Sequence, residues 1–184
     1  MFNKLHLVVS AVAALLLVSC VPNVDMPKGT SKGYTSARLI QRDPSLTAIT
    51  NPTEKQVHGM IQKSLAKNFN SRGMSYGKGG ADLIVAYMVI YQEPGMTADY
   101  RDYFGYGRNA DEIATIAHAR GVEKNKRPDY FRQAGILIDV VDARTNKLVY
   151  RNLAKGDVVK GVSPETRAAR IDDAVADALA DFFK

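Results

Sequence analysis

The segment 81–91, which reads ADLIVAYMVIY, is apolar on both of its alternating faces. Successive side chains of a β-strand point to opposite faces of the sheet, and a strand with one solvated face alternates between apolar and polar residues. The segment therefore predicts a central strand, or one that is covered on both sides. A chain with such a strand must fold around a layered core.

Two amphipathic helices are predicted, and each begins with the same N-terminal capping pattern. Asn51-Pro52-Thr53-Glu54 and Ser163-Pro164-Glu165 each place a capping side chain before a proline and a glutamate. Apolar residues then follow at helical spacing, and Gly73 ends the first helix. The predicted buried faces are Val57, Met60, Ile61, Ser64, Leu65 and Phe69 in the first helix, and Ile171, Val175, Ala178, Leu179 and Phe182 in the second.

A β-hairpin is predicted between the two helices. The strand 135–142 (GILIDVVD) leads into a polar turn at 142–147, and residues 148–159 return as its partner. A weaker strand is expected at 34–41. The element order predicts an α+β two-layer sandwich, with a small, mostly antiparallel sheet and two amphipathic helices on one face.

The N-terminus resembles that of a bacterial lipoprotein precursor. Lys4 precedes the apolar stretch 5–18, which is too short to span a membrane and is typical of a signal peptide. Leu17-Val18-Ser19-Cys20 is similar to a lipobox, which implies diacylglycerol on Cys20, cleavage before it, and a further acyl chain such as palmitate on the new amine. Val21 in place of aspartate implies the outer membrane, facing the periplasm. The alternative is an ordinary secretory signal with a chance cysteine.

These observations divide the chain into three parts. Residues 1–19 are predicted to be the lipoprotein signal peptide, 20–33 a lipidated tether, and 34–184 a single domain. Cys20 is the only cysteine, so no disulfide within the chain is expected. The 25 basic and 19 acidic residues are spread along the chain. This pattern suits anionic lipid or cell-wall polymer and is unlike the dense basic patch of a nucleic-acid-binding protein.

Three features together resemble a known family. They are the segment 81–85 before a long strand, the hairpin 135–151 (GILIDVVDARTNKLVYR), and an amphipathic helix that ends near Phe182. With the lipobox, they are similar to bacterial lipoproteins that carry domain of unknown function 4136, over roughly residues 34–183. The family usually has tryptophan where Tyr150 stands. The resemblance implies a fold and a cellular location, but no activity is assigned to the family.

The segment 94–133 is a long insert between two strands and is a candidate for function. Its aromatic residues alternate with glycine and charge, which suits a platform that stacks on sugar rings or on a partner's surface. The alternative is a Tyr/Gly loop folded loosely over the sheet. The candidate binding residues are Tyr100, Tyr103, Phe104, Tyr106 and Arg108.

The sequence proposes no catalytic, cofactor or metal site. His118 has Asp111 and Glu112 near it in sequence, but no second histidine at ligand spacing. The glycine-rich segment 73–80 precedes a strand, whereas a phosphate-binding loop precedes a helix. Asp139 and Asp142 are three residues apart in a strand, so they are expected on opposite faces.

The favoured function is a lipid-anchored, non-enzymatic envelope module that binds a protein partner, lipid or cell-wall polymer. One alternative is an auxiliary lipoprotein of an envelope transport assembly, and a third is a hydrolase acting on envelope material with its pocket under the insert. The acidic row Asp173, Asp177 and Asp181 is interpreted as a solvated helix face, the alternative being a stripe that binds a basic partner.

Overall fold

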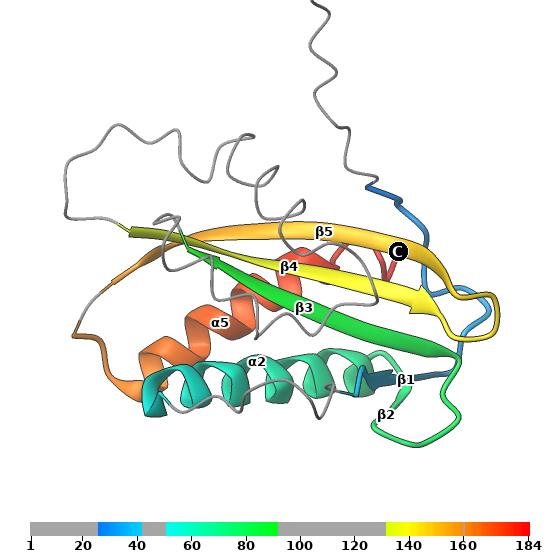
Figure 1. Ribbon diagram of the computed structural model, residues 1–184, viewed down its shortest axis with the longest axis horizontal. Helices are drawn as coiled ribbons and strands as arrows, with labels where there is room; N and C mark the ends of the chain where they lie inside the picture. The colour runs from blue at the N-terminus through cyan, green and yellow to red at the C-terminus, as the bar shows by residue number, and fades with distance from the viewer. Residues whose placement is uncertain (1–25, 42–50, 92–131, 160) are drawn as a thin grey trace, which may run out of the picture.

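The fold is taken from a computed structural model that describes residues 26–41, 51–91, 132–159 and 161–184. In chain order, the elements are β1 (Ser36–Leu39), α2 (Pro52–Ser71), β2 (Ser75–Tyr76), β3 (Leu83–Tyr91), β4 (Arg132–Asp142), β5 (Lys147–Val158) and α5 (Pro164–Leu179). Both helices lie on the same side of the sheet (Figure 1). The predicted two-layer α+β architecture is confirmed.

The five strands form one mixed sheet in the order β2-β1-β3-β4-β5. The long strands β3, β4 and β5 pair antiparallel, as expected, and β3 is the central strand. The short strands β1 and β2 pair parallel, β1 with β3 and β2 with β1. The sequence pattern does not predict the parallel pairs, and β2 lies within the glycine-rich segment 73–80, where no strand is expected.

Both helices begin as predicted. The Asn51 side chain accepts hydrogen bonds from the N–H groups of Thr53 and Glu54, at 2.9 and 3.4 Å. Ser163 Oγ accepts one from Thr166 N–H at 3.2 Å. Each bond satisfies an N–H that has no partner inside the helix, so each cap fixes where its helix begins.

The core lies between the helices and the face of the sheet that carries Leu83, Val85 and Tyr87 of β3. Residues of the two helices and Phe182, which follows the end of α5, complete it, all with no exposed surface: Ile61, Leu65, Phe69, Val175, Ala178, Leu179 and Phe182. Ile171 is half-buried and packs against this cluster. The opposite face of the sheet is also buried at Ile84, Ala86, Met88, Leu137 and Val141. Strand β3 is therefore apolar and buried on both of its faces, as the segment 81–91 predicts.

The hairpin contains one irregularity that decides which side chains meet. Val141 pairs with Leu148, but Val140 pairs with Tyr150, so Val149 is an extra residue in β5. This β-bulge places Tyr150 on the helix side of the sheet, where its hydroxyl donates to the Ala178 carbonyl at 2.6 Å. The Tyr150 ring also packs on Phe182, with centroids 5.3 Å apart. The bulge thus joins β5 to the end of α5.

Two predicted boundaries differ in the structure. Arg132 and Gln133, assigned to the insert, are the first residues of β4 and pair with Val158 and Asp157. The N-terminal stretch predicted as a tether is bound to the sheet in its second half, as described below. The candidate residues that the sequence analysis names within 94–131 lie outside the described part of the chain.

Candidate functional site

Of the residues that the sequence nominates for function, the acidic row Asp173, Asp177 and Asp181 is exposed on and just after α5, and the others fall outside the described part of the chain. Cys20 is one of them, as are the candidate binding residues Tyr100, Tyr103, Phe104, Tyr106 and Arg108. Their roles stay predictions. The described residues instead show how the chain that follows Cys20 meets the domain.

The segment 27–31 runs along the outer edge of β5. Arg151 N–H donates to the Pro27 carbonyl at 3.0 Å, and Gly29 N–H donates to the Val149 carbonyl at 2.8 Å. Between these bonds, Lys28 forms an antiparallel bridge with Tyr150. Val149 is the bulge residue, so the irregularity that orients Tyr150 also supplies an acceptor for the N-terminal segment.

Side chains and a second backbone bond reinforce this docking. Lys28 Nζ donates to Asn152 Oδ1 at 3.0 Å and lies 5.4 Å from the centre of the Tyr150 ring. Ser31 N–H donates to the Phe182 carbonyl at 2.7 Å, beyond the end of α5. A Cβ on Gly29 would lie 2.4 Å from the Val149 carbonyl oxygen, so only glycine allows this approach.

Asp142 ties the next part of the chain to the hairpin turn. Its Oδ1 accepts from the N–H groups of Arg144 and Thr145, at 3.0 and 2.7 Å, and its Oδ2 accepts from the Tyr34 hydroxyl at 3.0 Å. The Thr145 N–H is the main reason that the pKa of Asp142 lies below its usual value. Asp142 is therefore a structural acceptor at the turn, as the sequence suggests, and it is on the opposite face from Asp139.

Asp82 makes the corresponding link between β3 and β1. Its Oδ2 accepts from the N–H and hydroxyl of Thr35, both at 2.9 Å, and from those of Ser36, at 3.1 and 3.0 Å. These bonds, led by the Thr35 N–H, hold the pKa of Asp82 below its usual value. Ala143 N–H also donates to the Asp82 carbonyl at 2.8 Å.

These contacts join three segments, 27–36, 77–82 and 142–147, which we call the tether end of the domain. Figure 1 shows the hairpin turn, the N-terminal segment and the β2–β3 turn gathered at this end. Besides Lys28, which bonds Asn152, four exposed cations lie on the three segments: Lys32, Lys78, Arg144 and Lys147. Within the described residues, none of the four has an ion pair.

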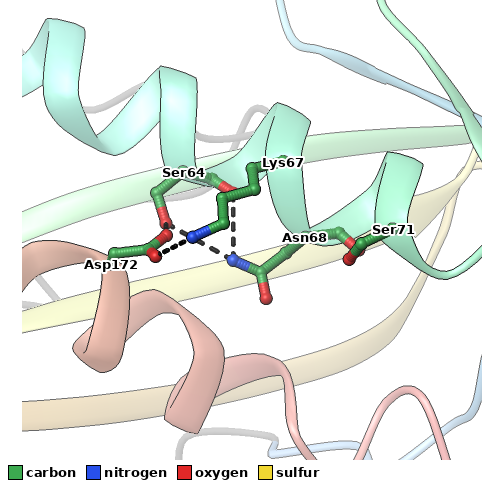
Figure 2. Close-up of polar contacts among 5 residues, drawn as sticks. All are labelled: Ser64, Lys67, Asn68, Ser71 and Asp172. Atoms are coloured by element: carbon green, nitrogen blue, oxygen red, sulfur yellow. Dashed lines mark hydrogen bonds and ion pairs between the residues drawn. The ribbon is translucent and has the colours of Figure 1, made fainter. Parts of the chain in front are cut away.

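A second polar cluster connects the two helices (Figure 2). Ser64 Oγ donates to Asp172 Oδ1 at 2.6 Å, and Lys67 Nζ donates to Asp172 Oδ2. The Lys67 bond, followed by the Ser64 bond, lowers the pKa of Asp172. Ser64 and Lys67 of α2 thus both donate to the one carboxylate that α5 presents to them. The cluster fastens α2 to α5.

A buried ion pair lies on the sheet face away from the helices. Arg151 Nε donates to Asp139 Oδ1 at 2.6 Å and its Nη2 donates to Oδ2, and both side chains are 2% exposed. The bulge at Val149 brings Arg151 directly opposite Asp139 in the register of β4 and β5. Two parallel hydrogen bonds between charged groups are a strong interaction. The free energy needed to remove both charges from water offsets much of the stabilisation that the pair provides.

His58 lies in a third cluster at the helix–sheet interface. Its Nδ1 is 2.9 Å from the Tyr87 hydroxyl, and Gln62 Nε2 donates to the same hydroxyl at 3.2 Å. The His58 and Tyr87 rings also contact each other, with centroids 5.6 Å apart. The described ranges hold no group of three or more histidine, cysteine, aspartate or glutamate side chains that could bind a metal ion. In the same ranges, neither helix has the length and apolar character needed to cross a bilayer.

The described residues form a two-layer α+β domain whose N-terminal segment is bound along the last strand of the sheet. The family model described as "Domain of unknown function (DUF4136)" matches residues 33–182. The chain belongs to that family, which confirms the resemblance seen in the sequence.

Twelve chains of solved structures match this chain, among them two PelC dodecamers at low sequence identity. A point variant of the PelC dodecamer from Paraburkholderia phytofirmans is 9% identical, with a TM-score of 0.45, and the match covers 88% of this chain and 96% of that chain. The PelC dodecamer from the same organism is 9% identical, with a TM-score of 0.42, and covers 88% and 94%. No curated protein matches this chain.

Proposed function

We propose that this protein is a bacterial envelope lipoprotein, acylated at Cys20 and held on the periplasmic face of the outer membrane. The observation that carries the proposal is Leu17-Val18-Ser19-Cys20 at the end of an apolar segment that follows Lys4. A cysteine thiol accepts a diacylglyceryl group, and two or more acyl chains anchor a protein stably where one does not.

The described fold agrees with an anchor at this position. Pro27 and Gly29 are already hydrogen-bonded to β5, so only a short segment separates Cys20 from the domain. The lipid would therefore hold the domain itself near the membrane.

We further propose that the domain acts by binding. The polar clusters in the described residues have structural partners: Asp172 bonds Ser64 and Lys67, and Asp139 bonds Arg151. These contacts support a role in holding the fold together. An envelope protein or cell-wall polymer is the proposed partner, with the aromatic residues of the insert, Tyr100 to Tyr106, as its contact surface.

Mass spectrometry of the protein extracted from membranes tests the anchor. We expect a mature chain that begins at Cys20 and carries diacylglyceryl and acyl groups. Cys20→Ser should abolish both the modification and extraction with the membrane fraction, while Ser19→Ala, which keeps a small residue before the cysteine, should preserve them. An unmodified wild-type chain would refute the proposal.

Crosslinking in intact envelopes tests the binding role. A variant with Tyr100, Tyr103 and Tyr106 changed to serine should lose a crosslinked partner that the wild type captures. A variant with Lys55 and Lys63 changed to glutamine, on the exposed face of α2, is the control and should retain it. If the wild type captures nothing above background, the binding role is wrong.

A further inference from the structure

The tether end carries an excess of unpaired positive charge. Lys32, Lys78, Arg144 and Lys147 are exposed and have no ion pair within the described residues. The carboxylates among the three segments that define this end, Asp82 and Asp142, are occupied by hydroxyl and backbone N–H donors. These cations are therefore available to a ligand outside the chain.

The fold holds the four cations on one end of the domain. Tyr34 bonds Asp142, which places the segment with Lys32 against the turn that carries Arg144 and Lys147. Ser36 bonds Asp82, and the Asp82 carbonyl accepts from Ala143, which brings the turn with Lys78 to the same place. The cations come from three segments that are distant in sequence, so their gathering is a property of the fold.

The same end is where the chain leaves for the proposed anchor. The described chain begins at Met26, one residue before the docked Pro27. Even fully extended, the six steps from Cys20 to Met26 span only about 20 Å. Anchoring at Cys20 would therefore keep Met26, where the described chain enters the tether end, within about that distance of the lipid headgroups.

We propose that the tether end binds the anionic lipid surface in which Cys20 is anchored, with the four cations facing phosphate-bearing headgroups. This inference rests on the proposed lipoprotein function and adds the surface of the domain that meets the membrane. Basic side chains at an anionic bilayer each strengthen binding by about fivefold, and the attraction extends only about 10 Å at moderate salt. The acyl chains provide the anchor, and the basic end sets the orientation of the domain.

Vesicle binding without the anchor tests this inference. The chain from residue 20, with Cys20→Ser, is mixed with phosphatidylcholine vesicles that contain or lack phosphatidylglycerol, and the bound fraction is measured by sedimentation. We expect binding only to the anionic vesicles, and weaker binding at high salt. Lys32→Gln, Lys78→Gln and Lys147→Gln together should reduce the affinity on the order of a hundredfold.

A matched variant separates position from net charge. Lys55→Gln, Lys63→Gln and Lys155→Gln remove the same charge from exposed lysines that also have no ion pair among the described residues and lie outside the tether end. This variant should bind within a few-fold of its parent. Equal losses in the two triple variants, binding that ignores salt, or no binding of the parent chain to anionic vesicles would each overturn the inference. Because these chains lack the acylated cysteine, such a result leaves the anchor itself to the mass-spectrometry test.

Discussion

Gly29→Ala should release the N-terminal segment from β5 while leaving the domain folded. The new Cβ would lie 2.4 Å from the Val149 carbonyl oxygen, a backbone atom that cannot move aside without distorting the bulge. The segment must therefore withdraw, and the backbone hydrogen bonds at Pro27, Gly29 and Ser31 are lost with it.

The free energy of docking residues 27–31 on β5 is the difference between two opposing terms. Each lost hydrogen bond costs about 1 kcal/mol, so the three backbone bonds and the bond from Lys28 to Asn152 cost about 4 kcal/mol, and the Lys28 contact with the Tyr150 ring adds about 0.5–1 kcal/mol. Five freed residues, 27–31, regain backbone entropy of about 1 kcal/mol each, which offsets that loss. The docking is thus closely balanced. We expect the free energy of unfolding of the whole domain to change by less than about 2 kcal/mol, while protection of the segment disappears.

Limited trypsin digestion and amide hydrogen exchange measure this effect. Cleavage after Lys28 and Lys32 should accelerate by tenfold or more in Gly29→Ala, and the Arg151 amide should exchange faster. The control is Gly59→Ala in α2, where an added Cβ meets nothing within 4 Å. The control should gain about 0.5–1 kcal/mol of helix stability and leave the digestion pattern unchanged. Wild-type cleavage and exchange rates in Gly29→Ala would refute the docking.

Three other changes have defined outcomes. Asp139→Asn removes the carboxylate charge that bonds the buried Arg151 and should cost about 3–5 kcal/mol in urea unfolding, whereas Asp139→Leu with Arg151→Met should recover most of that loss. Asn51→Ala should lower the free energy of unfolding by about 1 kcal/mol, because the first turn of α2 loses its cap. The pKa values of Asp82 and Asp142 are lowered in the folded state, so their contribution to stability is present above the unfolded pKa, about 4, and is lost as the pH falls through the lower folded values. Unfolding measured against pH should show this loss, and Asp82→Asn with Asp142→Asn should flatten it.

Each of these predictions has a result that contradicts it. An Asp139→Asn protein as stable as wild type would mean that the buried pair contributes nothing once its desolvation is counted. An unchanged helix after Asn51→Ala would show that the cap is redundant with Pro52. A pH profile with the same slope in the double asparagine variant would assign the acid sensitivity to other carboxylates, of which Asp172 is the first to test.

The parts of the fold that the sequence predicts well depend on local patterns. The caps at Asn51 and Ser163 were correct because a side-chain oxygen and the proline that follows it act within one turn. The central strand was correct because only a strand covered on both sides needs two apolar faces. The turn at 142–147 was correct because Asp142 bonds the backbone two and three residues ahead.

The parts that it does not predict depend on contacts between distant segments. β2 has two residues, too few for any periodicity, and its place is set by pairing with β1. The Asp139–Arg151 pair requires the bulge at Val149, because an unbroken register from Asp142–Lys147 would place Tyr150 opposite Asp139. No residue in the hairpin marks that bulge. A register counted from the turn would have put Arg151 on the wrong face.

The candidate site was missed for a related reason. The composition of residues 21–33, rich in proline and glycine, indicates a flexible tether, but the docking of 27–31 is made by backbone groups that composition does not reveal. Gly29 is the one residue in this segment whose type the docking requires, because a Cβ there would collide with the Val149 carbonyl. That requirement is visible only once Val149 is seen beside it. Asp82 likewise looks like an ordinary strand-start residue until β1 is seen beside it.

The two edge strands of the sheet, β2 and β5, have a consequence for a protein that is anchored in a membrane. A lipid anchor confines copies to two dimensions, where they collide often and in similar orientations. Long strands with free backbone groups would then tend to join copy to copy into aggregates. Here one edge strand, β2, has only two residues. The other is partly filled by residues 27–29, and farther along it Arg170 donates to the Asp157 carbonyl at 2.7 Å. The chain's own N-terminal segment thus limits polymerisation under the crowding that its anchor would create.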